Sequence, residues 1–178
     1  AGVFSLARKR IIWLLVLMLS ATLTGLIIRS FESALQSVVA LAAFIPMVMD
    51  TGGNAGSQSS SLVIRSIVLG EVEFKDILKV VWKEIRVSFL VGTCLALLNF
   101  LRVYLLEGYP IMIALTVSFT LVFTVMFAKV IGGVLPLIAK RLKLDPAIMA
   151  GPLITTIVDA AALIIYFYSA IWFIGIKV

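Results

Sequence analysis

Long apolar stretches separated by short polar clusters dominate the chain. Uncharged or nearly uncharged runs cover residues 11–28, 33–64, 87–106, 111–130 and 146–176. At about 1.5 Å per helical residue, each run is long enough to cross a hydrocarbon core about 30 Å thick. The pattern predicts an all-α integral membrane protein in which residues 1–178 form a single domain with five transmembrane helices.

The second run is too long for one straight span. Residues 33–64 would form a helix about 48 Å long. Pro46 and the glycine-rich segment 51–58 are the evident places for a break. We therefore expect this helix to be interrupted near residues 46–58. The spacing of Gly52 and Gly56 is also typical of close helix packing, which is the alternative interpretation.

Residues 71–86 follow a different pattern. Lys75, Lys79 and Lys83 recur every four residues, while Ile77 and Val81 mark another face. This arrangement predicts an amphipathic helix that lies in the membrane interface, with its basic residues toward lipid headgroups.

Basic residues gather on one side of the predicted membrane. With five spans, the N-terminus, the 65–86 segment and the 140–143 loop share a side, whereas Arg29 and Lys177 lie opposite. That side holds eleven basic residues: Arg8, Lys9, Arg10, Arg65, Lys75, Lys79, Lys83, Arg86, Lys140, Arg141 and Lys143. The positive-inside rule then predicts a multi-pass protein of the cell membrane with a cytoplasmic N-terminus and an external C-terminus. We interpret the basic residues behind the net charge of +6 as determinants of membrane topology, and we expect no nucleic-acid partner.

The composition narrows the possible chemistry. Hydrophobic residues make up 62% of the chain, which is too much apolar surface for a soluble domain of this size. Histidine is absent and Cys94 is the single cysteine, so imidazole-based metal chemistry and a disulfide framework are excluded. No pairing of a nucleophile with a base is visible, and we do not expect an enzyme.

Two acids interrupt the apolar runs, Asp50 in the second and Asp159 in the fifth. A charged side chain at the bilayer centre costs about 2.5–3.5 kcal/mol on insertion scales and commonly marks an ion pathway. Helical spacing places several small or oxygen-bearing residues on the Asp159 face. The residues expected to line a water-filled path are Gly53, Gly151, Thr155, Thr156, Ala162 and Tyr166.

Carboxylate, hydroxyl, amide and carbonyl oxygens suit magnesium, calcium or manganese. One aspartate per subunit can hold a hydrated ion when two subunits face each other, as a ring of acids does in cation channels. We therefore expect a homodimer in the lipid bilayer with a pore at the dimer interface, through which a divalent cation passes.

Other interpretations of the same residues stay open. The protein could be a secondary transporter that exchanges a divalent cation for sodium or protons, or a membrane subunit that transports nothing. Asp50 could pair with Lys129 or Arg65, and Lys129 could instead reach the interface or pair with an acid of a neighbouring helix. Thr155 and Thr156 could bond back to their own helix.

Two long motifs resemble the MgtE-type magnesium channel family. They are PMVMDTGGNAGSQSSSLVIR at residues 46–65 and DPAIMAGPLITTIVD at residues 145–159, and the resemblance covers essentially the whole chain. It implies a homodimer whose second and fifth helices line a magnesium pore. It also implies that Asp159 binds hydrated magnesium and faces its dimer mate, that Thr155 contributes its backbone carbonyl, and that Asn54 lies close to the pathway. Asp159, Thr155, Asp50 and Asn54 are thus the predicted metal-binding residues.

The chain departs from the family pattern in two respects. Family members commonly carry cytoplasmic domains that sense magnesium, and we expect no such regulatory domain within these residues. Some members have asparagine before the proline of the fifth helix, where this chain has Gly151.

Overall fold

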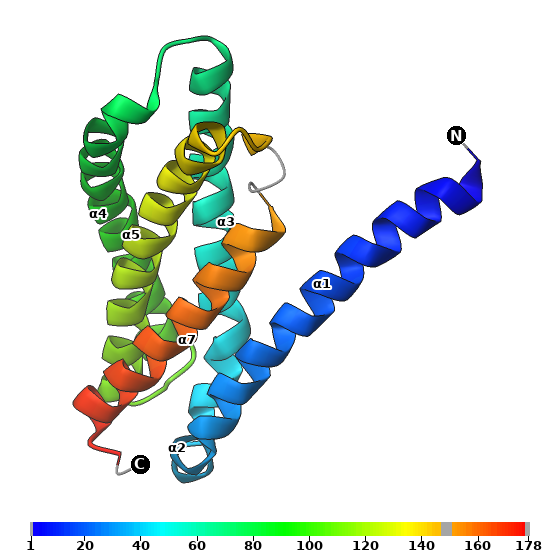
Figure 1. Ribbon diagram of the computed structural model, residues 1–178. Coiled ribbons are helices and arrows are strands. Elements are labelled where there is room, and N and C mark those ends of the chain that lie inside the picture. Colours follow the sequence, from blue (N-terminus) through cyan, green and yellow to red (C-terminus); the bar gives the residue numbers. More distant parts are fainter. Residues whose placement is uncertain (1, 147–150, 177–178) are drawn as a thin grey trace.

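The computed structural model describes residues 2–146 and 151–176, and all its elements are helices. They are α1 (Val3–Ser30), α2 (Glu32–Ser37), α3 (Ala40–Val68), the 3₁₀ turn Phe74–Asp76, α4 (Ile77–Leu101), the π-helical turn Arg102–Leu106, α5 (Ile111–Arg141) and α7 (Pro152–Ile174). Figure 1 shows α3, α4, α5 and α7 side by side in one bundle. The all-helical prediction is confirmed.

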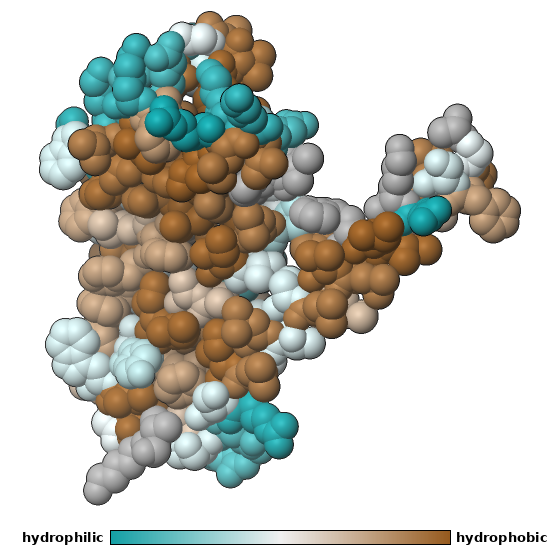
Figure 2. Space-filling model, viewed as in Figure 1, coloured by the Kyte–Doolittle hydropathy of each residue, from teal (hydrophilic) through white to brown (hydrophobic). Residues whose placement is uncertain are grey.

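Three of the described helical segments are long and apolar enough to cross a membrane, namely Phe74–Leu106, Ile111–Arg141 and Pro152–Ile174. A shorter apolar helical segment, Leu14–Ser30, lies in α1. The space-filling view shows a broad hydrophobic band with hydrophilic caps at both ends of the bundle (Figure 2). These features are typical of a membrane protein, while the count of five spans stays a prediction.

α5 forms the centre of the bundle and packs against α3, α4 and α7. Its side chains are apolar or small on several faces, as expected for a helix surrounded by other helices. The largest buried cluster joins Leu41 and Phe44 of α3 to Val117 of α5 and Tyr166 of α7. α1 instead touches mainly α7 and diverges from the bundle toward its N-terminus (Figure 1).

The predicted break near residues 46–58 is wrong, because α3 is one continuous helix that includes Pro46 and the glycine-rich segment. The interruption lies earlier, at Val38 between α2 and α3. The glycines serve helix packing: a Cβ on Gly52 would come within 2.8 Å of Val158 of α7, and one on Gly56 within 2.8 Å of Ile154. The tertiary contacts that glycine permits offset its low helix propensity.

The predicted interfacial helix at 71–86 is not a separate element. After the 3₁₀ turn, α4 runs without interruption from Ile77 to Leu101. A helix lying in the membrane plane would need a bend before the span, and α4 contains no proline that would cause one. Its basic residues therefore stand at one end of a long helix.

Two other boundaries also differ from the prediction. α5 continues past residue 130 to Arg141, and Pro136 lies buried inside it. α7 begins at Pro152, after Gly151 in a non-helical conformation, and residues 147–150 of the predicted fifth span lie outside the described residues. Within α5, Gly132 serves packing against α3, because its missing side chain lets the backbone of α5 approach the carbonyl oxygen of Gly56.

Candidate cation-binding site

A cavity between α3 and α7, here called the α3 cavity, brings together the acids of two separate helices. Its volume is about 450 Å³. It is lined by Ile45, Pro46, Met49, Asp50, Gly53, Asn54, Ser57, Thr155 and Asp159. All four predicted metal-binding residues and Gly53 therefore share one cavity, although about a hundred residues of sequence separate the two helices.

A second cavity of about 530 Å³, the α1 cavity, lies between α1 and α7. It is lined by Leu17, Ser20, Ala21, Thr24, Met49, Gly151, Pro152, Thr155, Thr156 and Asp159. Met49, Thr155 and Asp159 belong to both cavities, so the Asp159 carboxylate borders both α1 and α3. Gly151 and Thr156 lie on the α1 side of the site.

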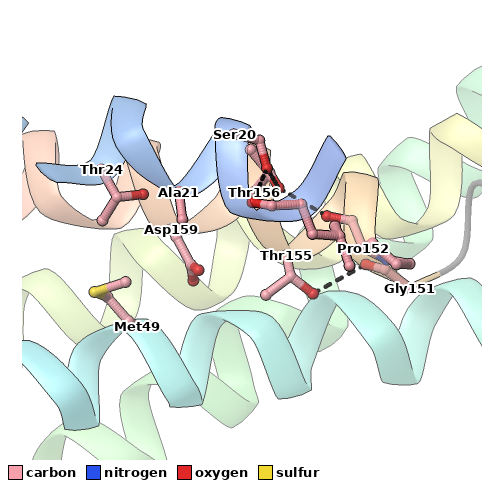
Figure 3. Close-up of a pocket in the computed structure, with 10 residues that line it drawn as sticks. Ser20, Ala21, Thr24, Met49, Gly151, Pro152, Thr155, Thr156 and Asp159 are labelled. Carbon is pink, nitrogen blue, oxygen red and sulfur yellow. Dashed lines mark hydrogen bonds between the residues drawn. The ribbon is translucent and has the colours of Figure 1, made fainter. Parts of the chain in front are cut away.

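Hydrogen bonds fix the two threonines of α7. The Thr155 hydroxyl donates to the Gly151 carbonyl at 2.9 Å, and the Thr156 hydroxyl donates to the Pro152 carbonyl at 2.9 Å. Figure 3 shows Thr155 and Asp159 on the side of α7 that faces α3, whereas Thr156 points toward Ser20 of α1. The interpretation that both threonines bond back to their own helix is confirmed, and their oxygens keep acceptor capacity.

No cation of the described residues neutralises the two acids. Neither Asp50 nor Asp159 takes part in any of the ion pairs found there. The suggested Asp50–Lys129 pair is not formed, because the Lys129 ammonium donates to Gln58 Oε1 at 2.7 Å. Asp50 is exposed and Asp159 half-buried, so both carboxylates are accessible from the cavity.

The donor set fits an ion that keeps its water. Within residues 2–146 and 151–176, no three acidic, cysteine or histidine side chains gather as a cluster that could hold a metal. Two carboxylates, one amide and two hydroxyls around a cavity of about 450 Å³ can accept hydrogen bonds from the water shell of magnesium, which dehydrates reluctantly. One chain alone therefore offers contacts to a hydrated cation rather than a closed coordination cage.

Ala162 and Tyr166 do not line either cavity, which corrects their predicted role. Both side chains are completely buried in the largest core cluster. The Tyr166 hydroxyl donates to the Leu41 carbonyl at 2.8 Å. They share the Asp159 face of α7, but the N-terminal part of α3 covers that face at their level.

Several residues that line the cavities were not predicted, although the sequence contains a signal for each of them. Ser57 continues the Asp50 and Asn54 face of α3 with a spacing of three. Ser20 and Thr24, four residues apart, place hydroxyl groups on one face of α1. The Ser20 and Thr156 hydroxyls lie 3.0 Å apart and join α1 to α7. A search of the apolar spans for polar residues spaced three or four positions apart would have identified these residues.

Comparison with known families identifies relatives of this chain. Residues 45–169 match the family model MgtE, described as a divalent cation transporter. The chain belongs to the MgtE family. The matched region includes α7 as far as Ser169 and the whole glycine-rich segment of α3.

Three relatives bear the name magnesium transporter MgtE. The protein of Thermus thermophilus is 38% identical over 166 residues, which are 93% of this chain and 36% of the relative. The protein of Bacillus subtilis is 38% identical over 94% of this chain and 37% of its own length. That of Enterococcus faecalis is 26% identical over 94% of this chain and 37% of its own length. The chain thus spans little more than a third of these MgtE relatives, which are named as transporters and not as enzymes.

Proposed function

We propose that this chain conducts hydrated magnesium across the cell membrane, with the α3 cavity as its ion-binding site. The observation that carries the proposal is the juxtaposition of Asp50 and Asp159, two carboxylates without a protein cation, in one cavity. Membership of a family described as divalent cation transporters supports this assignment. An intramembrane acid that faces a wet cavity commonly marks an ion path.

Each residue has a distinct role in the proposed site. Asp159 borders both cavities and selects for a divalent cation through its charge. Asp50 and Asn54, exposed along α3, accept hydrogen bonds from the water shell of the ion. Thr155 adds oxygen acceptors beside Asp159, and Gly53 keeps the facing wall of α3 free of a side chain.

A homodimer completes the site in this proposal. The α3 cavity is open on one side, and one chain lacks enough ligands to enclose a cation. A second copy of Asp159 across a dimer axis would double the negative charge on the path. Joining two chains through a bismaleimide at Asp159→Cys in a Cys94→Ser background tests this arrangement.

Magnesium flux into proteoliposomes tests the function directly. We expect Asp159→Ala to reduce the initial flux at least tenfold, equivalent to about 1.4 kcal/mol. Glu32→Gln, which removes an exposed acid outside both cavities, serves as the control and should conduct normally. Unchanged flux through Asp159→Ala contradicts the proposal.

Imposed gradients distinguish a channel from an exchanger. The proposed channel passes magnesium down its own electrochemical gradient, so a sodium or proton gradient of either sign should leave the flux unchanged at fixed membrane potential. Flux that requires one of these gradients would assign the chain to the secondary transporters. A purified chain that passes no magnesium under any gradient would assign it to membrane subunits without transport activity.

A further inference from the structure

A groove on the outward face of α4 combines basic, aromatic and aliphatic side chains. Its volume is about 340 Å³, and it is lined by Lys79, Trp82, Lys83, Arg86, Val87 and Leu90. Spacings of three and four residues place these side chains on one face of the helix. The opposite face packs into the bundle through Val80, Glu84 and Ser88.

The groove carries uncompensated positive charge. Lys79 forms an ion pair with Asp76 at 2.9 Å, but Lys83 and Arg86 take part in none of the ion pairs among the described residues. Glu84, the acid next to Lys83 in sequence, is only 7% exposed and accepts a 2.6 Å hydrogen bond from Ser59 of α3. Two cations of the groove are therefore available to an external anion.

The basic end of the groove passes directly into a lipid-facing surface. Leu90 is 67% exposed, and the exposed Leu97 continues the same face of α4. In Figure 2, hydrophilic surface caps the bundle at the end where α4 begins, above the broad hydrophobic band. Trp82 lies beside the bases, as is common for tryptophan at the level of lipid headgroups.

We propose that this groove binds an anionic phospholipid. The lipid phosphate lies between Lys83 and Arg86, the Trp82 ring packs at the headgroup level, and one acyl chain follows Val87 and Leu90. A soluble phosphate would contact the bases but gain nothing from the aliphatic part of the groove. An acidic peptide would have to leave backbone polar groups unpaired in the hydrocarbon beside Leu90.

Native mass spectrometry of the detergent-solubilised chain measures this preference. We expect phosphatidylglycerol to bind more tightly than phosphatidylcholine, and Lys83→Gln/Arg86→Gln to weaken phosphatidylglycerol binding about tenfold without changing phosphatidylcholine binding. Arg65→Gln/Lys140→Gln removes the same charge from exposed positions outside the groove and should bind as the unmodified chain does. Equal losses in both double variants, or no lipid preference in the unmodified chain, would overturn the proposal.

A second measurement leaves the groove intact. In Trp13→Phe/Trp172→Phe, the remaining tryptophan, Trp82, reports on the lipid beside it. Brominated phosphatidylglycerol, present as a minor component of a phosphatidylcholine bilayer, should quench Trp82 fluorescence more strongly than the same fraction of brominated phosphatidylcholine. Equal quenching contradicts lipid selection. Relief of the quenching by soluble glycerol phosphate would assign the groove to free phosphates and also overturn the proposal.

Discussion

Two acids of the bundle lie in opposite environments, Glu84 of α4 and Asp159 of α7. Glu84 is 7% exposed and accepts a 2.6 Å hydrogen bond from Ser59. The Lys129 ammonium lies 3.4 Å from the same Ser59 hydroxyl and is itself only 3% exposed. Asp159, in contrast, borders two cavities and has no protein cation among the described residues.

The difference separates a charge that is compensated within the protein from one that is not. The Glu84–Ser59–Lys129 network joins α4, α3 and α5, and its opposite charges compensate one another within the protein. Asp159 is left to be compensated from outside the chain, by water or by a passing cation. A buried acid therefore indicates an ion site only when the surrounding helices supply no counter-charge.

Removing Lys129, the cation of the Glu84–Ser59–Lys129 network, should have the largest effect on stability. Lys129→Met leaves the Glu84 carboxylate buried without its counter-charge, which should lower the free energy of unfolding by about 3–5 kcal/mol. Lys129→Met/Glu84→Gln, which is neutral at both positions, should recover most of this loss. Denaturant unfolding in micelles measures these changes, with the exposed Lys140→Met as control. A stable Lys129→Met would show that the network contributes nothing to the bundle.

The contact of α3 with α5 and the cavity between α3 and α7 should respond differently to an added methyl group. Gly132→Ala places a Cβ against the Gly56 carbonyl oxygen, so α3 and α5 must separate, at a cost of about 1–3 kcal/mol. A Cβ on Gly53 would lie 3.6 Å from Thr155 Cγ2, which is an ordinary contact. Gly53→Ala should therefore keep its stability and reduce magnesium flux by narrowing the α3 cavity. Loss of stability in Gly53→Ala and not in Gly132→Ala would reverse the assignment of the two sides.

Neutralising Asp159 should have the smallest effect on the free energy of unfolding. Asp159→Asn breaks no protein ion pair, so its free energy of unfolding without magnesium should change by no more than about 0.5 kcal/mol. Magnesium at ten times its dissociation constant should stabilise the unmodified chain by about 1.4 kcal/mol and leave Asp159→Asn unchanged. The pair of unfolding curves, with and without magnesium, measures both effects. Equal stabilisation of the two chains would place the ion elsewhere.

Much of the site was predictable from residue type, helical spacing and the resemblance to the MgtE family. Asp50 and Asp159 were selected as acids within apolar runs, Thr155 by its helical spacing from Asp159, and Asn54 through the resemblance, and all four line the same cavity. Helical spacing determines which residues share a face. The same rule placed Tyr166 on the Asp159 face, where the prediction was wrong. Spacing along one helix contains no information about where a neighbouring helix covers that face, and α3 covers it at Leu41.

The glycine-rich segment shows the same limit for the fold. Glycines in a long apolar run are compatible with an unwound helix or with close packing, and the sequence alone supports both. The structure shows close packing instead of an unwound helix: Gly52 lies against Val158 and Gly56 against Ile154, and side chains at these two positions would collide with α7. Likewise, Lys83 and Glu84 are neighbours in sequence, yet Lys83 lines the groove on the outward face of α4, whereas Glu84 is buried and accepts a hydrogen bond from Ser59.

The sequence by itself determined the membrane class, the family and the polar residues available for an ion, because composition and local spacing depend on the chain alone. Tertiary structure decided which acid is neutralised and which is free. That outcome depends on distances between helices: Lys129 of α5 approaches Ser59 beside Glu84, and no basic side chain of the described residues pairs with Asp159. Coulombic and hydrogen-bond energies depend on such distances, and they exist only once the helices have packed.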